Sequence, residues 1–309
     1  MCRGDAVIDV RRHNANFCEE HFLRLCRDQV AKAIKDASML EPDDRVLVAV
    51  SGGKDSLALW DLLVALGYQV DGLYLGLGIG GYSDASGEHA RRFAAERGLH
   101  LREVDLRADE GFDVPTAAEA TRRVPCSACG LSKRHLFDRA ALEGGYDALA
   151  TGHNLDDEAA VLLGNVLRWQ DDALGRQRPV LEARPGFPRK VKPLVRLGER
   201  ETAAYCVLRG IDYQVEECPM AAGNRHLGLK EALNAMERGS PGTKHAFYHG
   251  FLDRAVDRFA PGEDDSPVAL GACDRCGAPT TGEVCAYCRV AERAREAEPV
   301  ALGPTRRTR

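Results

Sequence analysis

The stretch that most constrains the fold is "VLVAVSGGKDSLALW", residues 46–60. An apolar, β-branched run stops at the hexapeptide SGGKDS (51–56), and an amphipathic helical pattern begins directly after it. A buried strand followed at once by a helix is typical of a βαβ unit in a parallel sheet. Glycines at such a turn let the backbone approach an anion, and N–H groups at the helix start attract phosphate oxygens.

Strand and helix patterns keep alternating after this first unit. Strand patterns in "RVLVAV", "QVDGLYLGLG", "HLREVDL" and "DALATGH" are separated by helical stretches such as "SGEHARRFAAERG" and "SKRHLFDRAALEGG". A helical lead-in covers 20–38, and a mostly helical stretch continues to about residue 260. We therefore expect an α/β fold with a doubly wound parallel sheet and small modules at both ends of the chain.

The hexapeptide differs from two common nucleotide-binding loops, because neither GxxxxGK followed by Ser or Thr nor GxGxxG is present at this turn. It resembles the SGGxDS signature of the PP-loop ATP pyrophosphatases. This resemblance implies cleavage of ATP between the α and β phosphates and transfer of AMP to a substrate oxygen. Ser51 and Ser56 can donate hydrogen bonds to phosphate, and Asp55 can hold Mg²⁺. The alternative is a glycine-rich turn without a ligand.

A second strand end carries polar residues in "ATGHNLDDEA", residues 150–159. Asp156 and Asp157 fall in the first turn of the next predicted helix, where acids complement the helix dipole. With His153 they could instead serve Mg-ATP or a proton transfer at the carboxyl edge of the sheet. We favour the second interpretation.

The cysteines bear on compartment and chemistry. No run of about 18 apolar residues is present, and "MCRGDAVIDVRRH" has no apolar core of a secretion signal. We therefore expect a cytoplasmic protein whose eleven cysteines ligate metals or act in catalysis rather than form disulfides. Cys26 and Cys206 stand alone in helical patterns, and we expect both to be buried.

The C-terminal cysteines follow the spacing of a four-thiolate zinc ribbon, Cys273-x2-Cys276-x8-Cys285-x2-Cys288. The alternative is a set of unrelated buried cysteines. The N-terminus offers Cys2, Cys18 and His21, with Asp5 where a second cysteine would complete a CxxC pair. An aspartate can ligate zinc but binds it more weakly than a thiolate, and His13 is a possible substitute.

Three further cysteines stand apart from the termini. Cys126 and Cys129 come just before a predicted helix with Lys133 one turn further on, and Cys218 lies in "VEECPMA". A helix start and a nearby cation stabilise thiolates. Three thiolates could hold an iron–sulfur cluster with one iron that has no protein ligand. Half of a structural zinc site, or a persulfide on Cys126 or Cys218, are the alternatives.

These motifs together resemble the two-thiouridine synthetase family, which sulfurates transfer RNA. The resemblance covers SGGKDS, "GLGIGGYS", "PCSACGLSKR", "ATGHNLDDEA", "EECP" and "PGTK", and nearly the whole chain. Within the family, the match is best to the enzyme that makes 2-thio-5-methyluridine in the T loop. The resemblance implies a [4Fe-4S] cluster on Cys126, Cys129 and Cys218, and catalytic roles for Lys133, Asp157 and Asp55. It implies an ATP site formed by Ala49, Ser51, Gly52, Gly53, Lys54, Asp55, Ser56, Leu75, Lys133 and Gly152.

The resemblance also implies partners: a tRNA, a ubiquitin-like sulfur carrier with a C-terminal thiocarboxylate, and a second copy of the chain. A net charge of -5 confines RNA contacts to local basic patches. The tail "TRRTR" is one candidate, and the other lies between 122 and 139, with Arg122, Arg123, Lys133, Arg134 and Arg139 against Asp138.

Three other functions remain open from the sequence. Thiolation of the wobble uridine at position 34 uses the same chemistry. An ATP-dependent amidotransferase or ligase could share SGGxDS but would have no use for Cys126, Cys129 and Cys218. A zinc-ribbon RNA-binding protein without ATP turnover is the third.

The expected organisation has five parts. They are an N-terminal zinc-finger-like module (1–26), a linking helix (27–44), an ATP-binding catalytic domain (45–215), a helical extension with the third cluster cysteine (216–262), and a C-terminal zinc ribbon with a basic tail (263–309).

Overall fold

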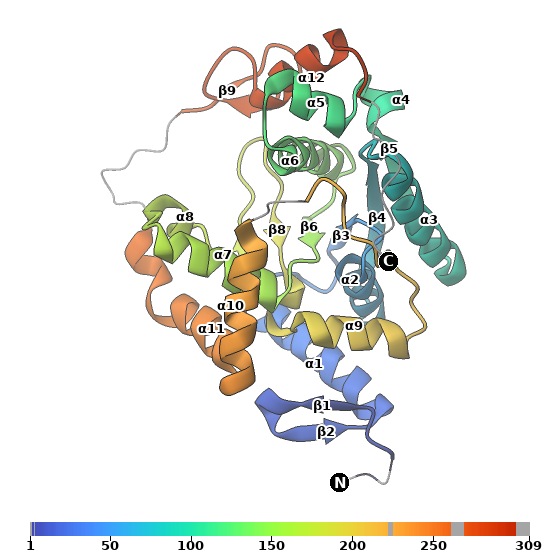
Figure 1. Ribbon diagram of the computed structural model, residues 1–309, viewed down its shortest axis with the longest axis vertical. Helices are drawn as coiled ribbons and strands as arrows, with labels where there is room; N and C mark the ends of the chain where they lie inside the picture. The colour runs from blue at the N-terminus through green and yellow to red at the C-terminus, as the bar shows by residue number, and fades with distance from the viewer. Residues whose placement is uncertain (1, 3, 222–224, 261–268, 301–309) are drawn as a thin grey trace.

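The chain folds around a six-stranded, mostly parallel sheet, so the predicted fold class is confirmed (Figure 1). The computed structural model describes residues 2, 4–221, 225–260 and 269–300. In strand order the sheet contains β5 (Leu101–Asp105), β4 (Gln69–Gly76), β3 (Arg45–Val50), β6 (Ala148–Thr151), β8 (Lys190–Val191) and β7 (Val180–Leu181). Only β7 runs antiparallel to its neighbour.

Helices cover both faces of this sheet. They are α1 (Glu19–Asp36), α2 (Lys54–Ala65), α3 (Gly80–Arg97), α4 (Leu106–Glu110), α5 (Val114–Thr121), α6 (Pro125–Glu143), α7 (Leu155–Leu167), α8 (Asp171–Gly175), α9 (Glu199–Leu208), α10 (Arg225–Gly239), α11 (Thr243–Arg254) and α12 (Ala286–Glu296), with short 3₁₀ turns η1 (Arg11–His13), η2 (Pro193–Arg196) and η3 (Val256–Phe259). No helix in the described part of the chain combines the length and apolar character that a membrane span requires.

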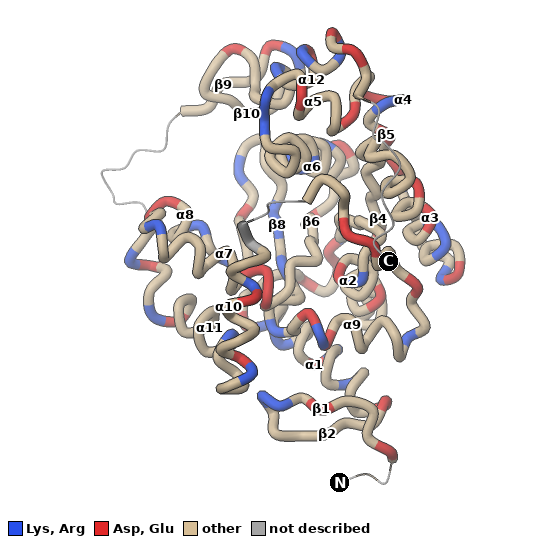
Figure 2. Tube along the Cα trace, in the orientation of Figure 1, with Lys and Arg blue, Asp and Glu red and all other residues tan. Residues whose placement is uncertain are grey.

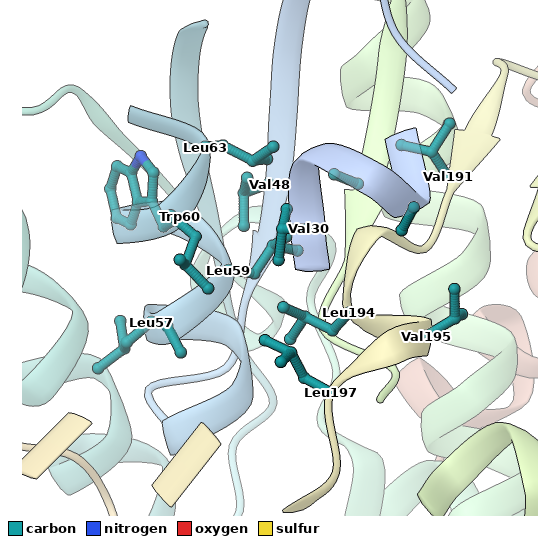
Figure 3. Close-up of a cluster of buried hydrophobic side chains, with 14 of the residues drawn as sticks. Val30, Val48, Leu57, Leu59, Trp60, Leu63, Val191, Leu194, Val195 and Leu197 are labelled. Carbon is teal, nitrogen blue, oxygen red and sulfur yellow. The ribbon is translucent and has the colours of Figure 1, made fainter. Parts of the chain in front are cut away.

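The central strand β3 is buried on both faces, as parallel sheets require. Val46, Val48 and Val50 point into one hydrophobic cluster, whereas Leu47 belongs to a second cluster on the other face. Figure 3 shows part of the first cluster, in which Val48 packs among side chains from α1, α2 and η2. The second cluster is filled from α5, α6 and α12.

The strand order fixes where a ligand can bind. The chain moves outward from β3 to β4 and β5 on one side, and to β6 and β8 on the other. The crevice beyond the carboxyl ends of β3 and β6 is therefore a topological switch point, where open α/β sheets bind ligands. The SGGKDS loop leaves β3 at this point, and Gly152 follows β6.

The N-terminal part is continuous with the body of the protein. The hairpin of β1 (Ile8–Val10) and β2 (Ala15–Phe17) leads into α1, which is one helix across the boundary expected after residue 26. Phe22, Cys26 and Val30 on α1 are fully buried in the first cluster. The same helix carries His21 and packs on the hydrophobic core. The structure therefore shows no boundary between a module and a linking helix at residue 26.

The C-terminal cysteine segment is likewise built into the core. It contains the hairpin of β9 (Gly271–Ala272) and β10 (Pro279–Thr280), followed by α12, which packs against α5 and α6. Tyr287 on α12 stacks on His135 with ring centroids 3.9 Å apart, and its hydroxyl donates to Glu110 Oε2 at 2.8 Å. The expected linker "APGEDDSP" lies outside the described residues except for its first residue, Ala260. The basic tail "TRRTR" lies entirely outside them.

Candidate active site

The SGGKDS loop depends on a glycine at position 52. Gly52 has a φ of +76°, and a Cβ placed there would lie 2.1 Å from the carbonyl oxygen of Ser86. Serine hydroxyls brace the rest of the turn, since Ser56 Oγ donates to Gly53 O at 2.9 Å and accepts from Ser51 N at 3.1 Å. The turn is thus fixed at the start of α2, where backbone N–H groups favour an anion.

Asp55 and Lys54 are held by partners from two other segments, the start of α7 and the helix α9. Asp55 Oδ1 accepts hydrogen bonds from Asn154 Nδ2 at 3.1 Å and Thr202 Oγ1 at 2.5 Å. Lys54 Nζ donates to Asp55 Oδ2 at 3.1 Å and to Glu199 Oε1 at 2.8 Å. Although burial opposes the charge on Lys54, the two carboxylates raise its pKa well above the ordinary value. Lys54 is therefore charged, and Asp55 is oriented at the mouth of the loop.

The loop after β6 packs directly on the SGGKDS turn. A Cβ at Gly152 would lie 2.9 Å from the backbone nitrogen of Ser56, so only glycine allows this approach. Asn154 caps α7 by accepting from the backbone N–H groups of Asp156 and Asp157, and Asp157 Oδ2 accepts from Asn154 N at 3.2 Å. Asp157 thus takes part in capping α7, as the simpler interpretation of the two acids expected. The N-cap residue itself, Asn154, was not predicted.

The two neighbouring aspartates have separate surroundings. Asp156 is only 5% exposed, accepts from Glu199 N at 2.9 Å and pairs with Lys244 of the PGTK motif. It therefore ties α7 to α9 and α11. Asp157 is more open, and its Oδ1 lies 2.6 Å from Lys230 Nζ on α10. Of the pair, Asp157 therefore has the more accessible carboxylate.

Two charged residues that the sequence did not single out connect Asp157 to the loop. Glu199 lies between Lys54 Nζ, 2.8 Å away, and Lys230 Nζ, 3.5 Å away. Lys230 in turn reaches Asp157. Burial raises the pKa of Glu199, but the two lysines lower it by more, so the pKa lies below its ordinary value. The result is a line of alternating charges from Lys54 to Asp157.

Lys133 on α6 faces the same region from the other side of the sheet. The side chain is half-buried, and among the described residues no carboxylate lies within 4 Å of its ammonium. Desolvation lowers the pKa of His153, and the charges of Lys192 and Lys133 lower it further, whereas Glu158 and Asp157 oppose this. His153 is exposed, with its Nδ1 2.9 Å from Thr151 Oγ1. Lys133 and Asp157 therefore both act on the His153 ring.

Two residues expected at the ATP site lie deeper in the sheet. Leu75 is 4% exposed, and its side chain belongs to the second hydrophobic cluster. Ala49 is half-buried on β3, two residues before the loop. Their side chains can shape the floor of the site, while any hydrogen bond to a ligand would have to come from their backbone.

The three central cysteines lie in one neighbourhood. Cys126 and Cys129 occupy the first two turns of α6, and Cys126 Sγ lies 3.8 Å from Met220 O in the turn that holds Cys218. Burial raises the pKa of Cys218, and the charges of Cys129 and Cys126 raise it further, whereas Lys133 lowers it. The start of α6 and the turn that holds Cys218 therefore lie next to each other.

The three central thiols differ from the terminal cysteine groups in their spacing. In the described part of the chain, both terminal groups have ligand atoms within 4.8 Å of one another, but Cys126, Cys129 and Cys218 do not form such a group. The other eight cysteines lie at the termini or, for Cys26 and Cys206, fully buried in the first cluster as expected. Three thiolates are the number that could hold a [4Fe-4S] cluster with one iron that has no protein ligand.

One hydrogen bond joins the segment of Cys218 to the SGGKDS loop. Gln214 N donates to Gly52 O at 2.9 Å, and Cys218 follows four residues later on the same segment. Lys133, one helical turn beyond Cys129, acts electrostatically on both Cys218 and His153. The cysteines and the loop are thus two halves of one region.

The cysteines at the two ends form compact groups. Cys273, Cys276, Cys285 and Cys288 offer four sulfurs within 4.8 Å of one another, the arrangement of a tetrahedral zinc site. At the other end, the group contains Cys2, Cys18 and His21, with Cys18 Sγ 3.5 Å from Cys2 Sγ and 3.1 Å from His21 Nδ1.

Among the described residues, no fourth ligand joins the N-terminal group. Neither Asp5 nor His13 belongs to it. Burial and the neighbouring Arg12 lower the pKa of His13, which lies beyond the hairpin strand β1. The expectation that Asp5 replaces a cysteine is therefore not supported by this arrangement.

The expected basic patch separates into different environments. Arg139 pairs with Glu110, and Asp138 pairs with Lys190 at 2.7 Å. Arg123 is exposed in the connection between α5 and α6. Within the range 122–139, only part of the positive charge is therefore free of nearby acids.

Comparison with known families agrees with this geometry. Residues 25–221 match the family described as "PP-loop domain", and residues 1–23 match "2-thiouridine synthetase TtuA, N-terminal LIM domain". The chain is therefore a PP-loop protein.

Relatives narrow this class further. The chain is 52% identical to the tRNA-5-methyluridine(54) 2-sulfurtransferase of Thermus thermophilus, over 94% of this chain and 89% of that protein. It is 40% identical to the protein of the same name from Pyrococcus horikoshii, over 94% and 92%. It belongs to the tRNA-5-methyluridine(54) 2-sulfurtransferase family. The same fold occurs in the U34-tRNA thiolase NcsA of Methanococcus maripaludis, solved with its [4Fe-4S] cluster, with a TM-score of 0.78, 24% identity and coverage of 97% and 98%.

Proposed function

We propose that this chain is an ATP-dependent tRNA 2-sulfurtransferase that acts on 5-methyluridine at position 54 in the T loop. The observation that carries the proposal is the adjacency of a pyrophosphate-type loop and a three-thiol group: Gln214 N donates to Gly52 O in the loop, and the same segment continues to Cys218 and to Met220 O, 3.8 Å from Cys126 Sγ. Family membership supports it, because both named relatives are 2-sulfurtransferases for that position. Thiolation at position 34 is not favoured by these relatives.

The reaction replaces an oxygen that is a poor leaving group. The C2 oxygen of the base attacks the α-phosphorus of ATP, the bond from that phosphorus to the β-phosphate oxygen breaks, and pyrophosphate leaves. Hydrosulfide sulfur then adds to C2, the bond from C2 to the activated oxygen breaks, and AMP leaves with that oxygen. Base, ATP and hydrosulfide give thionated base, AMP and pyrophosphate, with no net oxidation.

The residues of the SGGKDS loop bind the phosphates. Backbone N–H groups at the start of α2, with Ser51 and Ser56, would hold the pyrophosphate portion. Asp55 would hold Mg²⁺ on the phosphates, because Asn154 and Thr202 orient its Oδ1, while Lys54 contacts the other oxygen.

Lys133 and Asp157 act on the reacting groups. Lys133 has no carboxylate partner in the described residues, so its charge is available for negative charge that develops on the base or the α-phosphate. Asp157 would position the metal ion or the base. Gly152 allows the loop after β6 to lie against Ser56, so the loops after β3 and β6 stay in contact.

The thiols and terminal groups fit metal cofactors. A [4Fe-4S] cluster held by Cys126, Cys129 and Cys218 would supply an iron without a protein ligand, at which sulfide can be held. Zn²⁺ would bind Cys273, Cys276, Cys285 and Cys288, and more weakly Cys2, Cys18 and His21.

Partners and compartment complete the proposal. The donor is a ubiquitin-like carrier with a C-terminal thiocarboxylate, the enzyme works as a homodimer, and it acts in the cytoplasm, where its thiols stay reduced. We take residues 45–215 as the ATP-binding catalytic unit and 216–262 as the extension that brings in Cys218.

Anaerobic purification with iron and sulfide counting tests the cofactor. We expect about four irons per chain in the wild-type protein and a loss of iron with thiolation activity in Cys218→Ala. Cys26→Ala is the matched control, because that thiol is buried on α1 in the first cluster, away from the three thiols and the loop. Full iron content and activity in Cys218→Ala would overturn the metal assignment, and a persulfide route without iron would then replace it.

A further inference from the structure

A small hollow lies outside the active site, between the end of α5 and the ribbon helix α12. Thr121 and Arg123 line one side, and the other side is formed by Ala286, Arg289, Val290 and Arg293. Its volume is about 130 Å³, well below the roughly 300–1,000 Å³ of pockets that take whole small molecules. It can hold one phosphate-sized group but not a nucleotide.

The three arginines of the hollow are not neutralised. Among the described residues none of them has a carboxylate within 4 Å, although other arginines of the same region do. Two acids near the hollow are engaged elsewhere, because Glu292 pairs with Arg275 at 2.7 Å and Glu110 pairs with Arg139 and Arg295. The only hydrogen bond of these side chains in that part of the structure goes from Arg289 to the carbonyl of Val284.

Like charges lie close together in the hollow. Arg289 and Arg293 are exposed and stand four residues apart on α12, a spacing at which like charges repel each other. Arg123 adds a third positive charge from a different element. Guanidinium groups present forked donors that match phosphate oxygens. Figure 2 shows the basic positions on α12 and on the connection from α5 to α6.

The position of the hollow selects the source of the phosphate. Arg123 lies two residues before α6, which begins at Pro125 and carries Cys126 and Cys129. Val124, between them, is 69% exposed. A polymer whose phosphate occupies the hollow therefore lies beside the thiol group, whereas a free anion would gain nothing from this proximity.

We propose that Arg123, Arg289 and Arg293 form a clamp for one backbone phosphate of the tRNA substrate. The clamp rests on the proposed function, because a tRNA sulfurtransferase has a polynucleotide as its substrate. It assigns the ribbon helix a direct part in RNA binding, in addition to its packing on the core. Half or more of the hydrogen bonds in protein–nucleic acid complexes go to backbone groups and set the register of the complex, which is what the clamp would do here.

The test measures binding of unmodified tRNA to the full-length protein over a series of salt concentrations. The variant is the double substitution Arg289→Gln with Arg293→Gln, and the control is Arg275→Gln, which removes a charge from the same module at a position already paired with Glu292. We expect the double variant to bind about tenfold more weakly, with the slope of log affinity against log salt reduced by about 1. Arg275→Gln should stay within about twofold of wild type, and zinc and iron contents should not change.

Each other outcome has a defined meaning. Wild-type affinity and slope in the double variant would overturn the clamp, as would weaker binding with an unchanged slope, which would indicate a structural effect. Competition by inorganic phosphate at matched ionic strength would assign the hollow to a free anion and also overturn it. If the wild-type protein itself does not bind tRNA, the proposed function fails and not the clamp alone.

Discussion

Replacing Gly52 by alanine separates backbone strain from steric exclusion in the SGGKDS loop. At a φ of +76° an alanine costs about 1–2 kcal/mol. Its Cβ would also lie 2.1 Å from Ser86 O, a backbone atom that cannot rotate away, and such overpacking typically adds about 1–3 kcal/mol. We expect the free energy of unfolding to fall by about 2–5 kcal/mol, which is large against a total of about 5–15 kcal/mol.

Gly67→Ala is the matched control, because Gly67 has a φ of +90° and no heavy atom within 4 Å of the added Cβ. It should lose only the strain energy, about 1–2 kcal/mol. Urea unfolding measures both variants, and equilibrium ATP binding should weaken at least tenfold in Gly52→Ala and not in Gly67→Ala. Equal destabilisation of the two, with ATP binding intact in both, would refute the steric argument.

Three further predictions follow from the charges and packing. Lys230→Met should slow thiolation while iron content stays normal, because it frees Asp157 from its 2.6 Å partner; a wild-type rate would contradict this. Removal of zinc by a chelator should expose α12 to limited proteolysis, because the four C-terminal cysteines fix the position from which Tyr287 packs on the core. Equal cleavage rates with and without chelator would contradict this prediction. Burial lowers the pKa of His245 and His249 to about 4, below the value near 6.5 of an unfolded chain, so acidification from pH 7 to pH 5 should reduce the unfolding free energy by up to about 2 kcal/mol per histidine. The loss should disappear when both are replaced by asparagine, and its persistence would assign it to other groups.

Local motifs made the sheet and its loop predictable. The strand–turn–helix around SGGKDS places the loop by chain connectivity alone, and the left-handed backbone at Gly52 then requires the residue that stands there. Cysteine spacing was similarly informative at the C-terminus, because four ligands within sixteen positions leave few geometries.

Contacts between distant segments were not predictable from spacing. Glu199 and Lys230 follow no motif, yet they connect Lys54 to Asp157 because α9 and α10 fold back over the crevice. The sequence also gave no reason to separate Asp156 from its neighbour. The difference arises from Lys244, which lies 88 residues away and pairs with Asp156.

The packing of α12 on the core could not be predicted either, because it too depends on contacts between distant segments. An amphipathic helix beside a cysteine motif predicts a small independent module, and the long-range partner of its apolar face cannot be read from its own sequence. In the structure, Val290, Ala291 and Ala294 complete the second hydrophobic cluster.

Mass spectrometry of nucleosides tests the central claim most directly. Unmodified tRNA containing 5-methyluridine at position 54 would be incubated anaerobically with the iron-loaded protein, Mg-ATP and sulfide, then digested and analysed. The account predicts a thionated nucleoside at position 54 that requires ATP, appears with equimolar AMP and pyrophosphate, and is lost in Cys218→Ala. Sulfur at position 34 instead, or thionation that continues without ATP, would contradict it.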